Sequence, residues 1–257
     1  MKGLKLVITR SAEEAGSFSE KVRELGGIPI AIPMIRILPA QDEHAIRDAL
    51  SRLEQFAWLL FTSANGVNYF FHFMDKFAIP HQAIRAAIVT VGPKTSKALA
   101  KRGFASVIEA REFRQEGIIE ALEGKVKEGD FLLFPRGDLA RDQAIRALRE
   151  WGVHVEDPIV YRNLPNEEGA EELLSLLRRG EIDLITFTSP STFKNLHAIL
   201  ANKGEEHLLH GTRFACIGPV TAEAVRSCGF PVEIVAEEYT VDGLILAIQK
   251  WAEDRKN

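Results

Sequence analysis

The sequence VGPKTSKALAKRGF at residues 91–104 returns as IGPVTAEAVRSCGF at residues 217–230, a spacing of 126 residues. The same spacing relates further pairs, namely Phe61-Thr62-Ser63 with Phe187-Thr188-Ser189, Arg10 with Arg136, and Gly26 with Gly152. One register held across these landmarks indicates a tandem duplication. Two copies of 126 residues account for nearly all of the 257 residues, so no room remains for a third domain.

Each copy alternates short apolar runs, rich in β-branched and aromatic residues, with amphipathic segments. This alternation predicts strands followed by helices, which build a parallel sheet covered on both faces. The predicted strands are residues 4–9, 58–62, 86–91, 131–135, 183–188 and 213–217, and the predicted helices are residues 12–25, 65–74, 94–102, 139–151, 190–201 and 220–228. Glycines end four of these helices, at Gly26, Gly103, Gly152 and Gly229, where a left-handed residue is favoured. The predicted fold class is α/β.

Two polar, turn-prone stretches, at residues 36–43 and 162–169, are also one repeat apart. Each contains a proline that stiffens it, Pro39 or Pro165, which predicts linkers near 34–40 and 160–167. If the chain crosses between domains at both linkers, residues 37–165 form one domain, and residues 1–36 with 166–257 form a second, discontinuous one. The periodicity fits two contiguous halves equally well.

Charge and composition exclude several classes of protein. The 32 basic and 36 acidic residues are interleaved and give a net charge of -4, so no basic stripe predicts nucleic-acid binding. The longest apolar run, residues 56–61, is far short of the roughly 20 residues that cross a bilayer. The N-terminus shows no export signal, and two cysteines, Cys216 and Cys228, do not suggest a disulfide framework. We therefore expect a cytoplasmic protein.

Loops rich in Ser, Thr and Gly follow the predicted strands and open the next helices. They are residues 9–11, 62–65, 92–95, 188–191 and 218–221. Such loops present unpaired backbone N–H groups at the positive ends of helices, and open α/β sheets bind ligands at these strand ends. Because five loops share this chemistry, we predict a site for a polyanionic ligand. The alternative is ordinary helix capping by Ser and Thr.

Three larger side chains lie near the same strand ends. Arg10 and Arg136 are repeat mates, and each could clamp a carboxylate with two hydrogen bonds or form a surface ion pair. Tyr161 stands at the second linker, where its repeat mate is Ile35, so the duplication is broken there. This asymmetry suggests a specific task for the phenol, and the alternative is a partly buried tyrosine bonded to a backbone carbonyl.

Motifs for familiar cofactors fail on inspection. The GPKT sequence at residues 92–95 resembles a phosphate-binding loop, but the second copy has Val220 in place of Lys94. No G-x-G-x-x-G follows a strand, and no G-x-S-x-G surrounds a serine. His207 and His210 lack accompanying metal ligands in the sequence. We therefore predict neither a cofactor nor a metal.

The chain resembles the uroporphyrinogen-III synthase family over essentially its full length. The resemblance is carried by LVITR at 6–10, IPIAIPMIRI at 28–37, FTSANGV at 61–67, LLFPRGD at 132–138, VYR at 160–162, DLITFTSPST at 183–192, YTVDGL at 239–244 and the two segments quoted first. Each motif alone is short, and their order, spacing and duplication make the resemblance specific.

The resemblance implies two flavodoxin-like α/β domains joined by a two-stranded connection, with a cleft between them. It implies a cofactor-free lyase that converts hydroxymethylbilane, a linear tetrapyrrole with eight carboxylates, to uroporphyrinogen III with inversion of ring D and loss of water. Azafulvene and spiro-pyrrolenine intermediates are implied as well. A protein of net charge -4 would have to hold such a substrate with local, oriented donors.

Residue roles follow by position from the same resemblance. Tyr161 matches the hinge tyrosine and is the predicted catalytic residue, assisting departure of the hydroxyl. The predicted substrate-binding residues are Arg10, Thr62, Ser63, Gly92, Thr95, Arg136, Ser189, Gly218 and Thr221. We expect a monomer that binds neither nucleic acid nor membrane. The alternative function is a non-catalytic two-lobed protein that binds a small polyanion, which two α/β lobes and two linkers would also suit.

Overall fold

The computed structural model describes residues 1–110 and 115–254. The chain divides into two compact units: unit 1 comprises Met1–Arg36 and Leu164–Asn257, and unit 2 comprises Ile37–Asn163. The chain passes between them within strand β3 (Ile35–Pro39) and again within strand β10 (Ile159–Pro165). These two strands are neighbours in a small sheet, β3-β10-β8, with β8 at Arg136–Gly137. None of the helices in the described ranges combines the length and the apolar character needed to cross a membrane.

Unit 1 is built around a parallel sheet that, within the described residues, has five strands in the order β13-β12-β11-β1-β2. Its strands are β1 (Lys5–Ile8), β2 (Ile28–Ala31), β11 (Leu184–Phe187), β12 (Phe214–Cys216) and β13 (Ile234–Val235). Its helices are α1 (Ala12–Glu24), α7 (Glu167–Arg178), α8 (Pro190–Asn202), α9 (Pro219–Arg226) and α10 (Val241–Asp254), with a 3-10 turn at Glu206–Leu209.

Unit 2 has a parallel sheet of the same size within the described residues, in the order β6-β5-β4-β7-β9. Its strands are β4 (Trp58–Phe61), β5 (Ala87–Val91), β6 (Ile108–Ala110), β7 (Phe131–Leu133) and β9 (His154–Glu156). Its helices are α2 (His44–Ser51), α3 (Ala64–Lys76), α4 (Pro93–Ala100), α5 (Gln115–Leu122) and α6 (Gln143–Glu150), with 3-10 turns at Leu53–Gln55 and His81–Ala83.

The two sheets have the same arrangement but different connectivity. A shift of 126 residues carries β1 onto β7 and β11 back onto β4, and each strand then occupies the same place in its sheet as its repeat mate. In chain order, unit 1 reads 2-1-3-4-5, the flavodoxin order, whereas unit 2 starts at a different strand and reads 3-2-1-4-5. Each sheet therefore combines strands from both sequence copies, and the α/β fold class with parallel sheets is confirmed.

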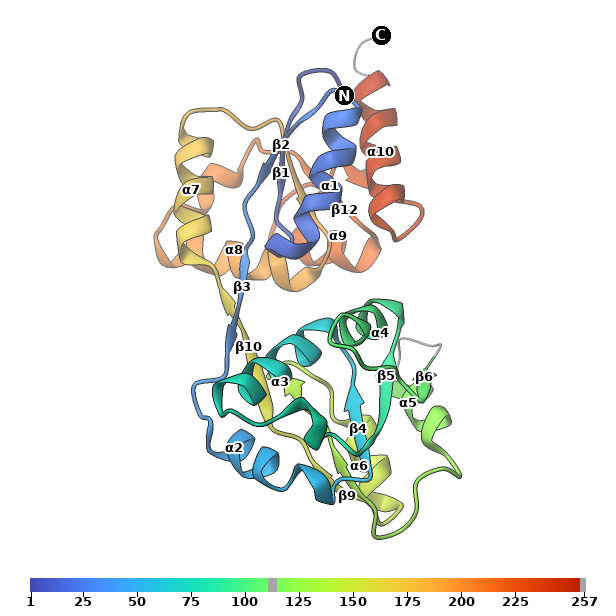
Figure 1. Cartoon of the computed structure of the whole chain (residues 1–257). Coiled ribbons are helices and arrows are strands. Elements are labelled where there is room, and N and C mark those ends of the chain that lie inside the picture. Colours follow the sequence, from blue (N-terminus) through green and yellow to red (C-terminus); the bar gives the residue numbers. More distant parts are fainter. Residues whose placement is uncertain (111–114, 255–257) are drawn as a thin grey trace. The chain divides into compact units, whose positions relative to one another are not determined.

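Helices cover both faces of each sheet, as a parallel sheet with buried strands requires. In unit 1, α7, α8 and α9 pack on one face through Leu173, Leu196 and Val225, while α1 and α10 pack on the other through Phe18 and Leu244. Figure 1 shows α1 and α10 side by side. In unit 2, α2, α3 and α4 share one face, and α5 and α6 share the other. Both units are therefore doubly wound.

The predicted helix ends and strands can be compared with the structure. Gly26, Gly103, Gly152 and Gly229 all have positive φ, between 78° and 86°, which confirms the predicted left-handed helix ends. Residues 28–37 form two strands in different sheets, since β2 pairs with β1 and β3 with β10. The helix predicted at 139–151 begins only at Gln143, because the preceding residues form β8 and a loop.

Candidate functional site

The carboxyl ends of the parallel strands place the predicted loops on one edge of each sheet. In unit 2 the winding direction reverses between β4 and β7, and Ser63 and Arg136 follow these two strands. In unit 1 the reversal lies between β1 and β11, which are followed by Arg10 and Ser189. The reversal point of an open α/β sheet is its usual ligand crevice, so this topology supports the predicted location.

Tyr161 and Ser63 form the central contact of the candidate site. The Tyr161 hydroxyl lies 3.1 Å from Ser63 Oγ. Ser63 is the N-cap of α3, and its Oγ accepts a hydrogen bond of 2.9 Å from the Gly66 N–H. Because that bond occupies one lone pair of Ser63, the serine hydroxyl can donate to the Tyr161 oxygen and leave the phenolic hydrogen free for a ligand. The capping alternative is thus confirmed for Ser63, and capping also connects Tyr161 to a helix N-terminus.

The Tyr161 ring fits against a glycine. Tyr161 on β10 pairs with Gly137 on β8, and a Cβ added at Gly137 would lie 2.5 Å from Tyr161 Cζ and 2.8 Å from its hydroxyl oxygen. Tyr69 on α3 stacks on the same ring, with centroids 5.7 Å apart and an interplanar angle of 24°. The Tyr69 hydroxyl donates to the Ile37 carbonyl at 2.7 Å. The ring position is therefore fixed by backbone on one strand and by an aromatic neighbour.

Asp138 holds the backbone on which Tyr161 stands. The Asp138 N–H donates to the Tyr161 carbonyl at 3.2 Å. Its Oδ1 accepts from the Asn163 N–H at 3.0 Å and from Asn163 Nδ2 at 2.9 Å. These bonds join β10 to the segment after β8 at Tyr161 and two residues beyond it. Since a shift of either strand would move the phenol, Asp138 and Asn163 are positioning residues for Tyr161.

The environment of Tyr161 raises the pKa of its phenol above the ordinary value of about 10. Burial is the largest cause, because it disfavours the phenolate. The hydrogen bond from Ser63 acts in the opposite direction, and the negative charge of Asp138 adds to the increase. At neutral pH the phenol is therefore protonated and suited to donate a hydrogen bond.

A spectroscopic titration tests this pKa. The phenolate absorbance that Tyr161→Phe removes from the wild-type curve is expected to titrate with a midpoint above that of an ordinary tyrosine. The pKa of Tyr161 is higher in the folded chain than in the unfolded chain. The phenol therefore adds to the free energy of unfolding at pH values below its unfolded-state pKa, and this contribution is lost as the pH rises through its folded-state pKa. The chain has three tyrosines, so the difference between the two proteins isolates one of them. A midpoint at or below that of an ordinary tyrosine would contradict the assignment.

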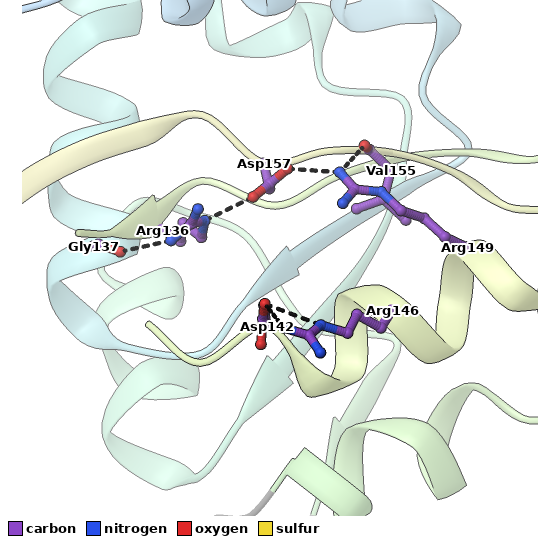
Figure 2. Close-up of polar contacts among 7 residues, drawn as sticks. All are labelled: Arg136, Gly137, Asp142, Arg146, Arg149, Val155 and Asp157. Carbon is purple, nitrogen blue, oxygen red and sulfur yellow. Dashed lines mark hydrogen bonds and ion pairs between the residues drawn. The ribbon is translucent and has the colours of Figure 1, made fainter. Parts of the chain in front are cut away.

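The two predicted arginines have acidic partners. Arg136 Nε lies 2.8 Å from Asp157, which also binds Arg149 at 2.8 Å, and Arg136 Nη1 is 3.5 Å from the Gly137 carbonyl, as Figure 2 shows. Arg10 Nη2 lies 2.7 Å from Glu14 one helical turn away. Both arginines therefore form ion pairs within the protein, which is the alternative to a carboxylate clamp given above. Their binding to substrate stays a prediction.

The remaining predicted residues occupy the strand-end loops with different exposures. Thr62 precedes Ser63 and is partly buried, and Gly92 precedes α4 with a φ of 78°. Thr95 and Thr221 lie in the first turns of α4 and α9, and each is only 3 % exposed, which limits direct access of a ligand to their hydroxyls. Ser189 caps α8 by accepting from the Thr192 N–H.

Gly218 precedes α9 in extended backbone, with φ 179° and ψ 176°. A Cβ there would be 3.0 Å from Cδ1 of Tyr239. A glycine is therefore used at this position for a close approach and not for an unusual dihedral angle. The group that approaches in the structure is a tyrosine ring.

Comparison with known proteins decides the family. A family model described as "Uroporphyrinogen-III synthase HemD" matches residues 16–246. The chain belongs to the uroporphyrinogen-III synthase family. A uroporphyrinogen-III synthase of Synechococcus elongatus is 31% identical to it over 254 residues, covering 97% of this chain and 96% of the relative. A second, from Chlorobaculum parvum, is 26% identical and covers 91% of this chain and 93% of the relative.

Solved structures of the uroporphyrinogen-III synthase family have the same fold. A mutant uroporphyrinogen III synthase from Thermus thermophilus matches 98% of this chain and 100% of its own, with a TM-score of 0.62 and 20% identity. A uroporphyrinogen-III synthetase from Helicobacter pylori matches 98% of this chain and 100% of its own, with a TM-score of 0.61 and 16% identity. At these identities the likeness concerns the fold.

In this member of the uroporphyrinogen-III synthase family, the residues that contact Tyr161 or hold its strand were not predicted from the sequence. Gly137, Tyr69, Asp138 and Asn163 were not predicted as site residues. One available signal was a second break in the repeat, because the mate of Gly137 is Ser11 just as the mate of Tyr161 is Ile35. The larger residue at 161 accompanies the smaller one at 137, and the structure places the two in contact.

Proposed function

We propose that this chain closes hydroxymethylbilane to uroporphyrinogen III, with inversion of ring D and loss of water. Its membership of the uroporphyrinogen-III synthase family supports the overall reaction. The observation that carries the assignment to a site is the protonated Tyr161 phenol, which is bonded to Ser63 at the strand-end edge of unit 2. The predicted monomer, the cytoplasmic location and the cleft between domains remain predictions.

In the proposed reaction, Tyr161 assists the first bond cleavage. Its phenol donates a hydrogen bond to the terminal hydroxyl of the substrate while that C–O bond breaks and electrons from the pyrrole form the azafulvene. The raised pKa favours hydrogen-bond donation over formation of a buried phenolate. The leaving hydroxide and the proton lost when the last pyrrole is restored together make the water that is released.

The later steps require little acid–base chemistry from the protein. The substituted carbon of ring D attacks the azafulvene and gives the spiro-pyrrolenine. Fragmentation and reclosure of this intermediate then invert ring D. The proposed contribution of the protein is to hold the flexible chain so that its two ends meet in this geometry. Backbone N–H groups at the starts of α3, α4 and α8 are the donors proposed for the substrate carboxylates.

An isomer assay tests the proposed function. Purified protein is mixed with freshly prepared hydroxymethylbilane, and the products are oxidised and separated as uroporphyrin isomers I and III. We expect isomer III in excess over the isomer I formed without protein. Formation of isomer I alone would contradict the synthase assignment and return the two-lobed binding protein as the better reading.

A further inference from the structure

An exposed aromatic ring stands at the strand-end edge of unit 1. Tyr239 is 67% exposed and follows β13, the strand that pairs with β12. Gly218, on which the Tyr239 ring rests, ends the loop after β12, and Val220, which is 73% exposed, lies in the first turn of α9. Two exposed apolar side chains therefore flank Gly218 on the edge where this fold binds ligands.

Gly218 leaves the space in which one edge of the Tyr239 ring lies. An added Cβ would lie 3.0 Å from Cδ1, 3.3 Å from Cγ and 3.4 Å from Cε1 of Tyr239. The extended backbone at Gly218 is open to any residue, so the contact with Tyr239 is what favours glycine there. The contact uses one edge of the ring and leaves most of the residue exposed.

The segment that carries Tyr239 is firmly built. Thr240 Oγ1 accepts from the Gly243 N–H at 3.0 Å, and the Thr240 N–H donates to the Glu238 carbonyl at 2.8 Å. A Cβ at Gly243 would lie 2.2 Å from that same carbonyl oxygen, so the turn closes tightly around Tyr239. The following helix, α10, is anchored in the core by Leu244. An exposed ring on a fixed backbone loses little conformational freedom when it binds a ligand.

The charges around the ring indicate which part of the substrate it contacts. Glu237 and Glu238 precede Tyr239, and both are exposed. Their negative charge opposes a substrate carboxylate at this place and leaves the flat, uncharged pyrrole as the suitable partner. Offset stacking or edge-to-face packing between two aromatic rings provides the attraction.

We propose that Tyr239 is a substrate-binding residue whose exposed ring packs against a pyrrole ring of the linear tetrapyrrole, and that the close contact with Gly218 positions this ring. This assignment rests on the proposed function. It changes the role predicted for Gly218, which acts through Tyr239 and does not bring the backbone to the ligand. The second copy of the repeat thus contributes an aromatic contact as well as N–H donors.

A double-mutant cycle tests the proposal. Wild type, Gly218→Ala, Tyr239→Ala and the double variant are compared for kcat and KM with hydroxymethylbilane. We expect Tyr239→Ala to raise KM about five- to tenfold with kcat nearly unchanged, and Tyr239→Phe to restore most of the affinity. Gly218→Ala is expected to raise KM about threefold in wild type and to have no further effect in the Tyr239→Ala background.

Control experiments distinguish a failure of this proposal from a failure of the proposed function on which it rests. Leu246→Ala removes another exposed apolar side chain, 52% exposed on α10, and is expected to leave KM unchanged. Urea unfolding of each variant shows whether its fold is intact. If wild type forms only isomer I, the proposed function fails. If wild type forms isomer III but Tyr239→Ala keeps the wild-type KM, or Gly218→Ala has equal effects in both backgrounds, the role assigned here is overturned.

Discussion

Tyr161→Phe is expected to lower kcat at least tenfold, which corresponds to about 1.4 kcal/mol of activation free energy. The phenylalanine ring keeps the stack with Tyr69 and the fit against Gly137, so only the hydroxyl is removed. Since the hydroxyl is assigned to the departure of the terminal oxygen and not to general binding, KM should change little. Steady-state kinetics with hydroxymethylbilane provide both numbers.

Ser63→Ala offers a graded comparison with Tyr161→Phe. It removes the serine bond that orients the phenol but leaves the phenol itself, so a smaller loss of kcat is expected. It also removes the interaction that lowers the pKa of Tyr161, so the titration of the phenol should move to higher pH. Both variants should unfold cooperatively in urea. Unchanged kinetics of Tyr161→Phe would remove Tyr161 from the mechanism.

Gly137→Ala is expected to reduce kcat by at least as much as Tyr161→Phe. The new methyl group would lie 2.5 Å from Tyr161 Cζ, and the pairing of β8 with β10 prevents the backbone from retreating freely. The ring has to move and carries its hydroxyl away from Ser63. Overpacking of this kind also destabilises a fold by about 1–3 kcal/mol, which urea unfolding measures.

Gly16→Ala is the matched control for Gly137→Ala. Gly16 lies inside α1, and a Cβ added there meets nothing within 4 Å. Alanine is a better helix former than glycine, so we expect stabilisation by roughly 0.5–1 kcal/mol and unchanged kinetics. If Gly137→Ala retained the wild-type kcat, the catalytic position of the Tyr161 phenol would not depend on the space that Gly137 leaves for its ring.

The fold was largely predictable because the duplication presents each pattern twice. Strands such as β4 and β11 are short runs of mostly apolar residues that lead into the same Phe-Thr-Ser sequence, and the glycines after the helices mark where each helix ends. The short edge strands β6 and β13 gave no comparable signal, because runs of two or three residues have no periodicity. The late start of α6 was missed because β8 is stabilised by its pairing with β10, a partner distant in sequence.

The candidate site was predictable only where one residue departs from its repeat mate. Tyr161 was singled out in this way and its catalytic role stays a prediction, whereas its partner Ser63 was predicted as a substrate contact with no link to the phenol. For Arg136 the sequence permitted either a carboxylate clamp or an ion pair, and only the folded chain shows Asp157 beside it. Partners of side chains depend on strand register and rotamer, which local sequence does not encode.

The shared strands of the two repeats set an order of assembly during synthesis. Unit 2 spans one uninterrupted segment, so its sheet can form while β11, β12 and β13 are still to be made. Strand β1 must wait for β11, its neighbour in the finished sheet. By then β3 and β10, adjacent in the small sheet, hold the ends of the unit 2 segment together. The first-made residues thus reach their partners across a short loop, with a correspondingly small entropy cost of closure.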